Sequence, residues 1–126
     1  MDFTLSEEQE MLRKSARDFL ADKCPKSYLR QMETDEKGYS PALWREMAEL
    51  GWQGLAIPVL YGGSGMEFIG MAVLLEEMGR ACLPGPFFAT VVLGALTILE
   101  DGNDKQKAAY LPDIASGKII MTLALN

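Results

Sequence analysis

Apolar residues recur three and four positions apart over most of this chain, a spacing that places them on one face of an α-helix. The first such stripe consists of Leu12, Ala16, Phe19 and Leu20. Ser6 and Gln9 precede it with the spacing of a capping box, in which each side chain binds the other residue's backbone amide. Pro25 follows the stripe, and proline ends a helix because it lacks an amide donor. A first helix is therefore predicted between Ser6 and Pro25.

Two further segments continue the helical spacing. The shorter has apolar positions Tyr28, Leu29 and Met32, and the longer has Leu43, Trp44, Met47 and Leu50 on one face. Ser40 before Pro41 predicts the start of the longer helix, because serine caps free amides and proline suits the first helical position. Gly51 is expected to end this helix in the left-handed conformation. Trp44 and Trp52 are predicted to be buried anchors.

The helical spacing is lost between Trp52 and Gly65. The glycine-rich stretch 61–65 precedes the next predicted helix, so its amides could hold a phosphate group. It lacks the Lys-Ser/Thr pair of a nucleotide-binding loop, however, and follows no clear parallel strand. We therefore favour a structural role, in which the glycines allow a tight reversal of the chain.

A largely buried helix is predicted from Glu67 to Gly79, because most of its sides are apolar. Its interior positions are Ile69, Ala72, Val73, Leu74, Leu75 and Met78. After Pro86, the positions Phe87, Val91, Gly94 and Ile98 predict another apolar helix that ends near Asp101. Asn103 or Asp104 then caps a further helix that closes at Ser116 and Gly117.

The run from Ile119 to Leu125 is the one convincing strand of the sequence. The predicted fold is all-α, an up-and-down helical bundle-like domain with a C-terminal strand stub. Residues 1–118 form the helical domain, and residues 119–126 form the first strand of a following domain. A lone strand leaves its backbone groups unpaired, so it could instead join the sheet of another chain. We favour the following domain.

Composition excludes several classes of function. The net charge of −6, with scattered basic residues, disfavours binding to nucleic acid. The chain has no histidine, which excludes Ser-His and Cys-His nucleophilic sites and imidazole metal sites. No metal ligand and no catalytic residue is predicted within this chain. No apolar run is long enough to cross a membrane, so a cytoplasmic protein is expected.

Two pairs of residues are candidates for chemistry. Glu76 and Glu77 could suggest paired catalytic carboxylates, but neighbours on a helix point about 100° apart. We expect a solvated face or an ion pair with Arg80 instead. Cys24 and Cys82 could both be buried as small apolar side chains, and we favour reduced thiols over a disulfide between them.

Five motifs, in order along the chain, resemble the acyl-CoA dehydrogenase family. They are Phe3-Thr4-Leu5-Ser6-Glu7-Glu8-Gln9, then Leu50-Gly51 with Leu55-Ala56-Ile57-Pro58 and Tyr61-Gly62-Gly63-Ser64-Gly65, then Leu75-Glu76-Glu77-Met78-Gly79-Arg80, then Gly102-Asn103-Asp104-Lys105-Gln106-Lys107 with Tyr110-Leu111-Pro112, and finally Thr122-Leu123-Ala124-Leu125. Each motif alone is weak. Their order and their coverage of nearly the whole chain identify it as resembling the N-terminal helical domain of the family.

The resemblance implies an enzyme of three domains that oxidises an acyl-CoA thioester between its α and β carbons. FAD would bind between the middle and C-terminal domains, and electrons would pass to an electron-transfer flavoprotein. The implied assembly is a homo-oligomer. The flavin motif and the catalytic carboxylate of the family have no counterpart in this chain, so no cofactor-binding residue is assigned here. The chain alone is expected to be inactive and not to retain FAD.

The resemblance places the wall of the acyl pocket on the helix after Pro86. The expected substrate contacts are Pro86, Ala89, Thr90 and Leu93. The depth of such a pocket would set chain-length preference, since each buried methylene contributes about 0.8 kcal/mol. Ordinary core packing is the alternative for each of these residues. For the whole protein, the alternatives are an acyl-CoA oxidase or flavin-dependent monooxygenase of the same superfamily, or a stand-alone helical binding module.

Overall fold

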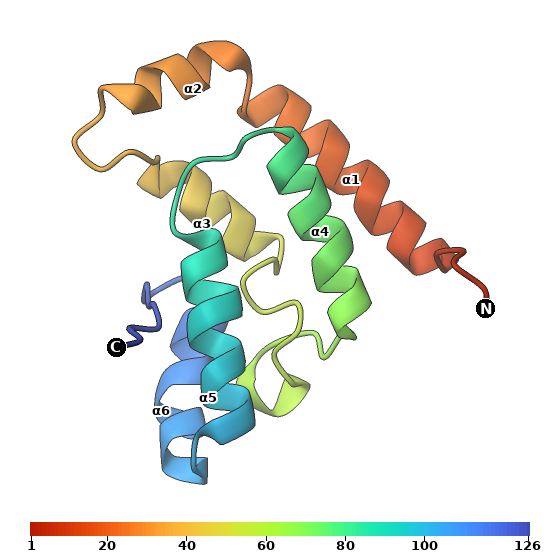
Figure 1. Cartoon of the computed structure of the whole chain (residues 1–126), viewed down its shortest axis with the longest axis vertical. Coiled ribbons are helices and arrows are strands. Elements are labelled where there is room, and N and C mark those ends of the chain that lie inside the picture. The colour runs from red at the N-terminus through yellow and green to blue at the C-terminus, as the bar shows by residue number, and fades with distance from the viewer. The chain divides into compact units, whose positions relative to one another are not determined.

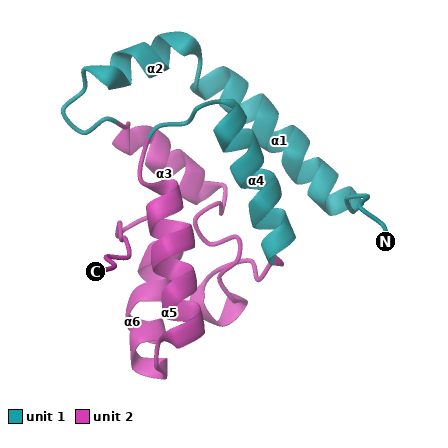
Figure 2. Ribbon diagram, in the orientation of Figure 1, with its two compact units in different colours: residues 1–38, 68–84 teal, residues 39–67, 85–126 magenta.

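The chain folds into helices connected by loops, and all residues 1–126 are described by a computed structural model (Figure 1). It contains no strand, so the all-α prediction is confirmed. The chain divides into two compact units, residues 1–38 with 68–84 and residues 39–67 with 85–126 (Figure 2). No helix has both the length and the apolar character needed to cross a membrane.

The first unit contains α1 (Glu7–Lys23), α2 (Lys26–Glu33) and α4 (Phe68–Arg80), and α1 lies beside α4 (Figures 1 and 2). The predicted stripe of α1 supplies the buried Ala16 and Leu20. From α4, Met71 and Leu74 have no exposed surface. The packing of these two helices follows from apolar faces that the sequence displays at helical spacing.

The buried face of α4 differs from the predicted one. Ile69 is 52% exposed and Ala72 is exposed, so the prediction that both lie inside was wrong. The buried positions of α4 are Gly70, Met71, Val73, Leu74, Glu77 and Met78. Helical spacing identifies an amphipathic face only when polar residues mark the opposite side, and the first turns of α4 carry apolar residues all round.

The second unit contains α3 (Pro41–Glu49), the 3₁₀ helix η1 (Val59–Tyr61), the π-helix η2 (Phe88–Ala95), α5 (Leu96–Asp101) and α6 (Asp104–Ala115). One cluster of its core consists of Ile57, Ala95, Leu111, Ile114 and Ala115, with Tyr61, Ile98, Leu99, Ile119 and Met121 packed against them. Trp44 and Trp52 are buried as predicted. The indole nitrogen of Trp44 donates to the carbonyl oxygen of Gly117 at 2.9 Å, which joins α3 to the end of α6.

The predicted helix boundaries of this unit are largely confirmed. Ser40 caps α3 through the amide of Leu43, and Asn103, rather than Asp104, caps α6 in a capping box with Gln106. Gly51 has a φ of +81°, the left-handed stop expected after α3. Leu50 is 52% exposed, however, so its assignment to the buried face was wrong. Leu50 lies beyond the last turn, as the C-cap residue.

Residues 119–126 form no strand, which corrects the predicted stub. The physical reason is that a strand is defined by the ladder it shares, and no second strand exists in the chain to pair with it. Exposure nevertheless alternates along the segment. Ile119, Met121 and Leu123 are half-buried, whereas the intervening Ile120, Thr122 and Ala124 are exposed. This period of two is typical of an extended chain with one face on a core.

Ser6 caps α1 as predicted, accepting from the amide of Gln9 at 3.2 Å while Gln9 accepts from the amide of Ser6 at 3.0 Å. Ser6→Ala is expected to lower the free energy of unfolding by about 1 kcal/mol, because the amide of Gln9 loses the hydroxyl that caps it. Urea unfolding followed by circular dichroism measures the change. Ser15→Ala, at an exposed position within α1, is the matched control and should not destabilise. Equal effects of the two variants would contradict the capping argument.

Candidate functional site

The π-helix η2 carries the residues predicted to line a ligand pocket. Pro86 lies two residues before η2, while Ala89, Thr90 and Leu93 lie within it. Short π-helical stretches are rare and are found frequently at functional sites. Sequence spacing did not distinguish this helix from an α-helix. Because η2 continues directly into α5, the two were predicted as one helix.

The structure separates the four predicted residues by exposure. Pro86, Ala89 and Leu93 are half-buried, whereas Thr90 has no exposed surface. The amide of Thr90 donates to the carbonyl oxygen of Pro86 at 2.9 Å, which brings these two residues together at the start of the helix. Ala89 and Leu93 stand four positions apart and both keep accessible surface. Like Pro86, they keep apolar atoms that a ligand could contact directly.

The hydroxyl of Thr90 binds the backbone of the C-terminal segment. It accepts from the amide of Met121 at 3.2 Å and donates to the carbonyl oxygen of Met121 at 3.3 Å. Gly94 is also close to this residue, since a Cβ atom added there would lie 3.0 Å from the Cβ atom of Met121. Sequence reasoning missed Met121, because no local pattern indicates a contact between residues 31 positions apart.

The glycine-rich loop is a closed structural reversal. The amides of Gly63, Ser64, Gly65 and Met66 all donate to backbone carbonyl groups of residues 54–58. Gly62 and Gly65 have φ values of +84° and +65°, the left-handed region that favours glycine. These amides are therefore already bonded, and the structure supports the predicted turn over the phosphate-binding alternative.

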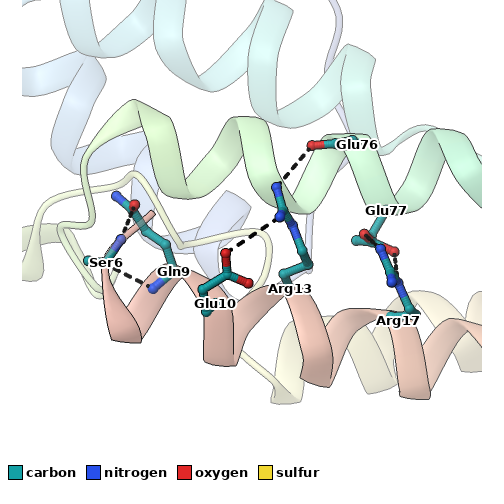
Figure 3. A network of polar contacts seen from close by, with 7 residues as sticks. All are labelled: Ser6, Gln9, Glu10, Arg13, Arg17, Glu76 and Glu77. Atoms are coloured by element: carbon teal, nitrogen blue, oxygen red, sulfur yellow. Dashed lines mark hydrogen bonds and ion pairs between the residues drawn. The ribbon is translucent and has the colours of Figure 1, made fainter. Parts of the chain in front are cut away.

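Glu76 and Glu77 bind two different arginines of α1 (Figure 3). A carboxylate oxygen of Glu76 lies 3.5 Å from a guanidinium nitrogen of Arg13. Glu77 accepts two hydrogen bonds from Arg17, at 3.0 Å from Nε and 2.7 Å from the terminal nitrogen. The two carboxylates thus do not converge on a common ligand, as predicted. The prediction that Arg80 would be the ion-pair partner was wrong. Glu77 instead pairs with Arg17 of α1, a helix distant in sequence, and local spacing could not indicate that contact.

The Glu77 side chain is only 2% exposed. The hydrogen bonds from Arg17 hold the pKa of Glu77 below its usual range, and the nearby charges of Arg80 and Arg13 act in the same direction. The same pair raises the pKa of Arg17. Both side chains therefore stay charged, and Glu77 is unsuited to general acid or base catalysis near neutral pH.

The two cysteines are free thiols in different surroundings. Cys24 is buried, and its Sγ atom lies 3.7 Å from the carbonyl oxygen of Ala81. Burial, with a smaller contribution from Cys82, raises the pKa of the Cys24 thiol, so this thiol is poorly nucleophilic. Cys82 is exposed and has a φ of +53°, which corrects the expectation that it would be buried. It lies in the turn after α4, where the chain reverses before Pro84.

The first unit has two open grooves. One lies between α1 and α4 and holds about 200 Å³, with Arg17, Glu77 and Arg80 in its wall. The other lies beside α2 and holds about 320 Å³, lined by Leu29, Met32 and neighbouring side chains. Neither groove is lined by an aromatic residue against which a flavin ring could stack. These grooves do not fit FAD, and no group of acidic, cysteine or histidine side chains is placed to hold a metal ion.

Residues 6–118 match the family model described as "Acyl-CoA dehydrogenase, N-terminal domain". A probable acyl-CoA dehydrogenase of Bacillus subtilis is 35% identical over 130 aligned positions, which cover all of this chain and 33% of that protein. The chain spans about a third of the length of the curated relatives that it matches.

Solved structures show the same likeness. A variant of the Tcur3481-Tcur3483 steroid ACAD has 39% identity and a TM-score of 0.86, covering 94% of this chain and 32% of that one. The glutaryl-coenzyme A dehydrogenase in complex with glutaryl-CoA has 33% identity and a TM-score of 0.82, covering 96% of this chain and 31% of that one. The matched part of each structure is thus a similar helical domain.

Proposed function

Because this chain belongs to the acyl-CoA dehydrogenase family, whose N-terminal domain it forms, we propose that the whole protein oxidises an acyl-CoA thioester to its 2,3-enoyl derivative. FAD is the proposed oxidant. The flavin-contacting and proton-abstracting residues are proposed to belong to other parts of the polypeptide, since neither of the two grooves of the first unit fits FAD.

This domain is proposed to form one wall of the acyl pocket. The observation that carries this role is the π-helix η2, in which Ala89 and Leu93 keep accessible apolar surface while Thr90, Val91 and Gly94 are buried. Pro86 would shape the entry of the helix, and Thr90 would hold the wall in place through its hydroxyl. An apolar wall binds an acyl tail by removing its methylene groups from water, and it needs no charged residue for this task.

The partners are proposed with the function. They are an acyl-CoA as substrate, an electron-transfer flavoprotein as electron acceptor, and further copies of the protein in a homo-oligomer. The cytoplasm is the proposed compartment, since both thiols are free. Residues 119–126 are proposed to begin the middle domain.

The proposed function is tested with the full-length protein. We expect it to copurify with FAD and to lose the visible flavin absorption when a saturated acyl-CoA is added anaerobically. A panel of linear, branched and steroid-sized CoA esters would identify the substrate class. Retention of flavin without reduction by any of the esters would contradict the proposal, and stoichiometric consumption of oxygen would favour an oxidase.

The wall assignment predicts a change in chain-length preference. Ala89→Leu in the full-length protein adds three carbon atoms to the wall, so kcat/KM for the longest accepted acyl chain should fall on the order of tenfold. The value for the shortest accepted chain should change little. Steady-state kinetics across a homologous series measures the ratio. Ala108→Leu, at an exposed position of α6, is the matched control. An equal loss for short and long chains would argue against a role of Ala89 in pocket depth.

A further inference from the structure

Both cysteines of the chain lie at the same end of the first unit. Helices α1 and α4 run in the same direction, and the arginines of α1 meet the glutamates of α4 in the same order along both helices. The C-terminal ends of the two helices therefore lie together (Figure 1). Cys24 is the C-cap residue of α1, and Cys82 belongs to the turn that follows α4. The packing of these helices thus brings together two thiols that are distant in sequence.

The sulfur of Cys24 contacts the peptide group that joins Ala81 to Cys82. Its Sγ atom donates to the carbonyl oxygen of Ala81 at 3.7 Å, and the carbon of this carbonyl is bonded to the nitrogen of Cys82. Burial, and then the charge of a Cys82 thiolate, raise the pKa of Cys24, and the influence of one charge on another decays with distance. The two thiols are therefore spatial neighbours, although 57 positions separate Cys24 from Ala81.

The two thiols differ in their access to solvent. Cys82 is exposed and lines the groove beside α2, so a small oxidant in solution can reach it directly. Cys24 is only 6% exposed. An accessible cysteine beside a second, resolving cysteine is a common arrangement in redox sensors. In this pair, Cys82 meets the oxidant, and Cys24 is placed to react with the oxidised sulfur.

We propose that Cys24 and Cys82 form a reversible disulfide when hydrogen peroxide oxidises the protein, and that this bond is a redox switch that fastens the end of α1 to the turn after α4. Both thiols are free in the structure, which is the reduced state of the switch. The proposal concerns the first unit alone and is independent of the proposed oxidation of acyl-CoA.

The reaction has two steps, and hydrogen peroxide is the oxidant. The Cys82 thiolate attacks one oxygen atom of the peroxide, which breaks the O–O bond, releases hydroxide and leaves a sulfenic acid. The Cys24 thiolate then attacks the oxidised sulfur, so that the S–S bond forms and the S–O bond breaks, with release of a second hydroxide. The two hydroxides take up the two thiol protons as water. A reducing dithiol reverses the reaction by thiol–disulfide exchange and is itself oxidised.

The disulfide is expected to stabilise the packing of α1 on α4. It would close a long loop of the chain, and such a cross-link removes conformational freedom mainly from the unfolded state. The melting temperature should therefore rise by about 5 °C on oxidation and return to its first value after reduction.

Peroxide treatment of the full-length protein, followed by digestion without reductant and mass spectrometry, tests the switch. The peptides that contain Cys24 and Cys82 should be found joined, and dithiothreitol should separate them. Differential scanning calorimetry of the reduced, oxidised and re-reduced protein measures the shift in melting temperature. Absence of the joined peptide would overturn the proposal, as would a disulfide between Cys82 of one copy and Cys82 of another. A joined peptide without any rise in melting temperature would overturn the role as a switch.

Two serine variants of the full-length protein separate the roles of the thiols. Cys24→Ser keeps a donor for the carbonyl oxygen of Ala81 but removes the resolving thiol, so dimedone, which traps sulfenic acids, should label Cys82 more strongly than in the wild type. Cys82→Ser, at an exposed position, is the matched control, and dimedone should not label Cys24 in it. Neither variant should gain stability from peroxide.

Equal labelling of Cys82 in the wild type and in Cys24→Ser would show that Cys24 does not resolve the sulfenic acid, which contradicts the proposal. Labelling of Cys24 in Cys82→Ser would contradict the assigned order of reaction. These experiments need neither acyl-CoA nor turnover. Their failure would leave the proposed function intact, and a protein that forms the disulfide but oxidises no acyl-CoA would contradict the proposed function alone.

Discussion

Gly63→Ala is expected to lower the free energy of unfolding on the order of 3 kcal/mol, the largest loss among the single substitutions considered. A Cβ atom at this position would overlap the carbonyl oxygen of Ile57 and would lie 2.5 Å from that of Gly54. Both overlaps involve backbone, which cannot rotate away as a side chain could. The loop from residue 54 to residue 66 must therefore open.

Opening this loop breaks the bonds that close it. The amide of Gly65 donates to Ile57, that of Ser64 to Gly54 and that of Met66 to Leu55, each at 2.9 Å. Gly54 is itself tightly packed, with a position for Cβ only 3.0 Å from the Cβ atom of Ala115. The loop thus cannot move toward α6. The steric overlap at residue 63 can therefore be relieved only by breaking the hydrogen bonds that close the loop.

Chemical unfolding monitored by tryptophan fluorescence measures the loss, since Trp52 is buried close to the loop in sequence. Gly79→Ala is the matched control, because a Cβ atom at Gly79 has no neighbour within 4 Å. Gly79 lies inside α4, so alanine there should stabilise the helix by about 0.5–1 kcal/mol. Equal stability of the Gly63→Ala variant and the wild type would contradict the packing described for this loop.

Arg17→Met is expected to lower the melting temperature on the order of 5 °C or more. The carboxylate of Glu77 would stay buried without the guanidinium that donates two hydrogen bonds to it. Replacing both residues by methionine should recover most of this loss, because an apolar pair leaves no unpaired charge. Melting temperatures of the wild type, both single variants and the double variant make up a double-mutant cycle, which measures the interaction energy of the pair. Strict additivity would show that the pair does not interact energetically.

The same pair predicts a dependence of stability on pH. The pKa of Glu77 is lower in the folded protein than its usual value of 4.5. The unfolded chain therefore binds the proton more readily, and the stabilisation by Arg17 is complete above pH 4.5 and declines as the pH falls through the folded pKa. Glu77→Met should flatten this part of the acid limb. The comparison requires melting temperatures of both proteins at several pH values, and parallel acid limbs would contradict the assignment.

Several features of the fold could be predicted because they depend on near neighbours. The caps at Ser6 and Ser40 each join residues three positions apart, and Gly51 ends its helix through its own backbone freedom. The buried face of α1 follows from the helical period alone. The errors at Ile69 and Ala72 arose where the sequence is apolar on every side and the period no longer identifies a face.

The candidate site was only partly accessible from sequence. The resemblance predicts Pro86, Ala89, Thr90 and Leu93 as contacts, but it did not show that Thr90 is fully buried with its hydroxyl occupied. The π-helical geometry also escaped prediction, because apolar spacing is similar in α- and π-helices over two turns. Which of the four residues remain accessible is a matter of packing.

Most of the helices, their caps, the closed glycine loop and the family follow from the amino-acid sequence alone. These depend on backbone preferences and on side chains within a few positions of each other, which every stretch of sequence displays. The tertiary structure alone decided the partner of Glu77, the contact between Thr90 and Met121, and the absence of a strand in residues 119–126. Each depends on groups from distant parts of the chain, and a strand exists only where a second one satisfies its backbone.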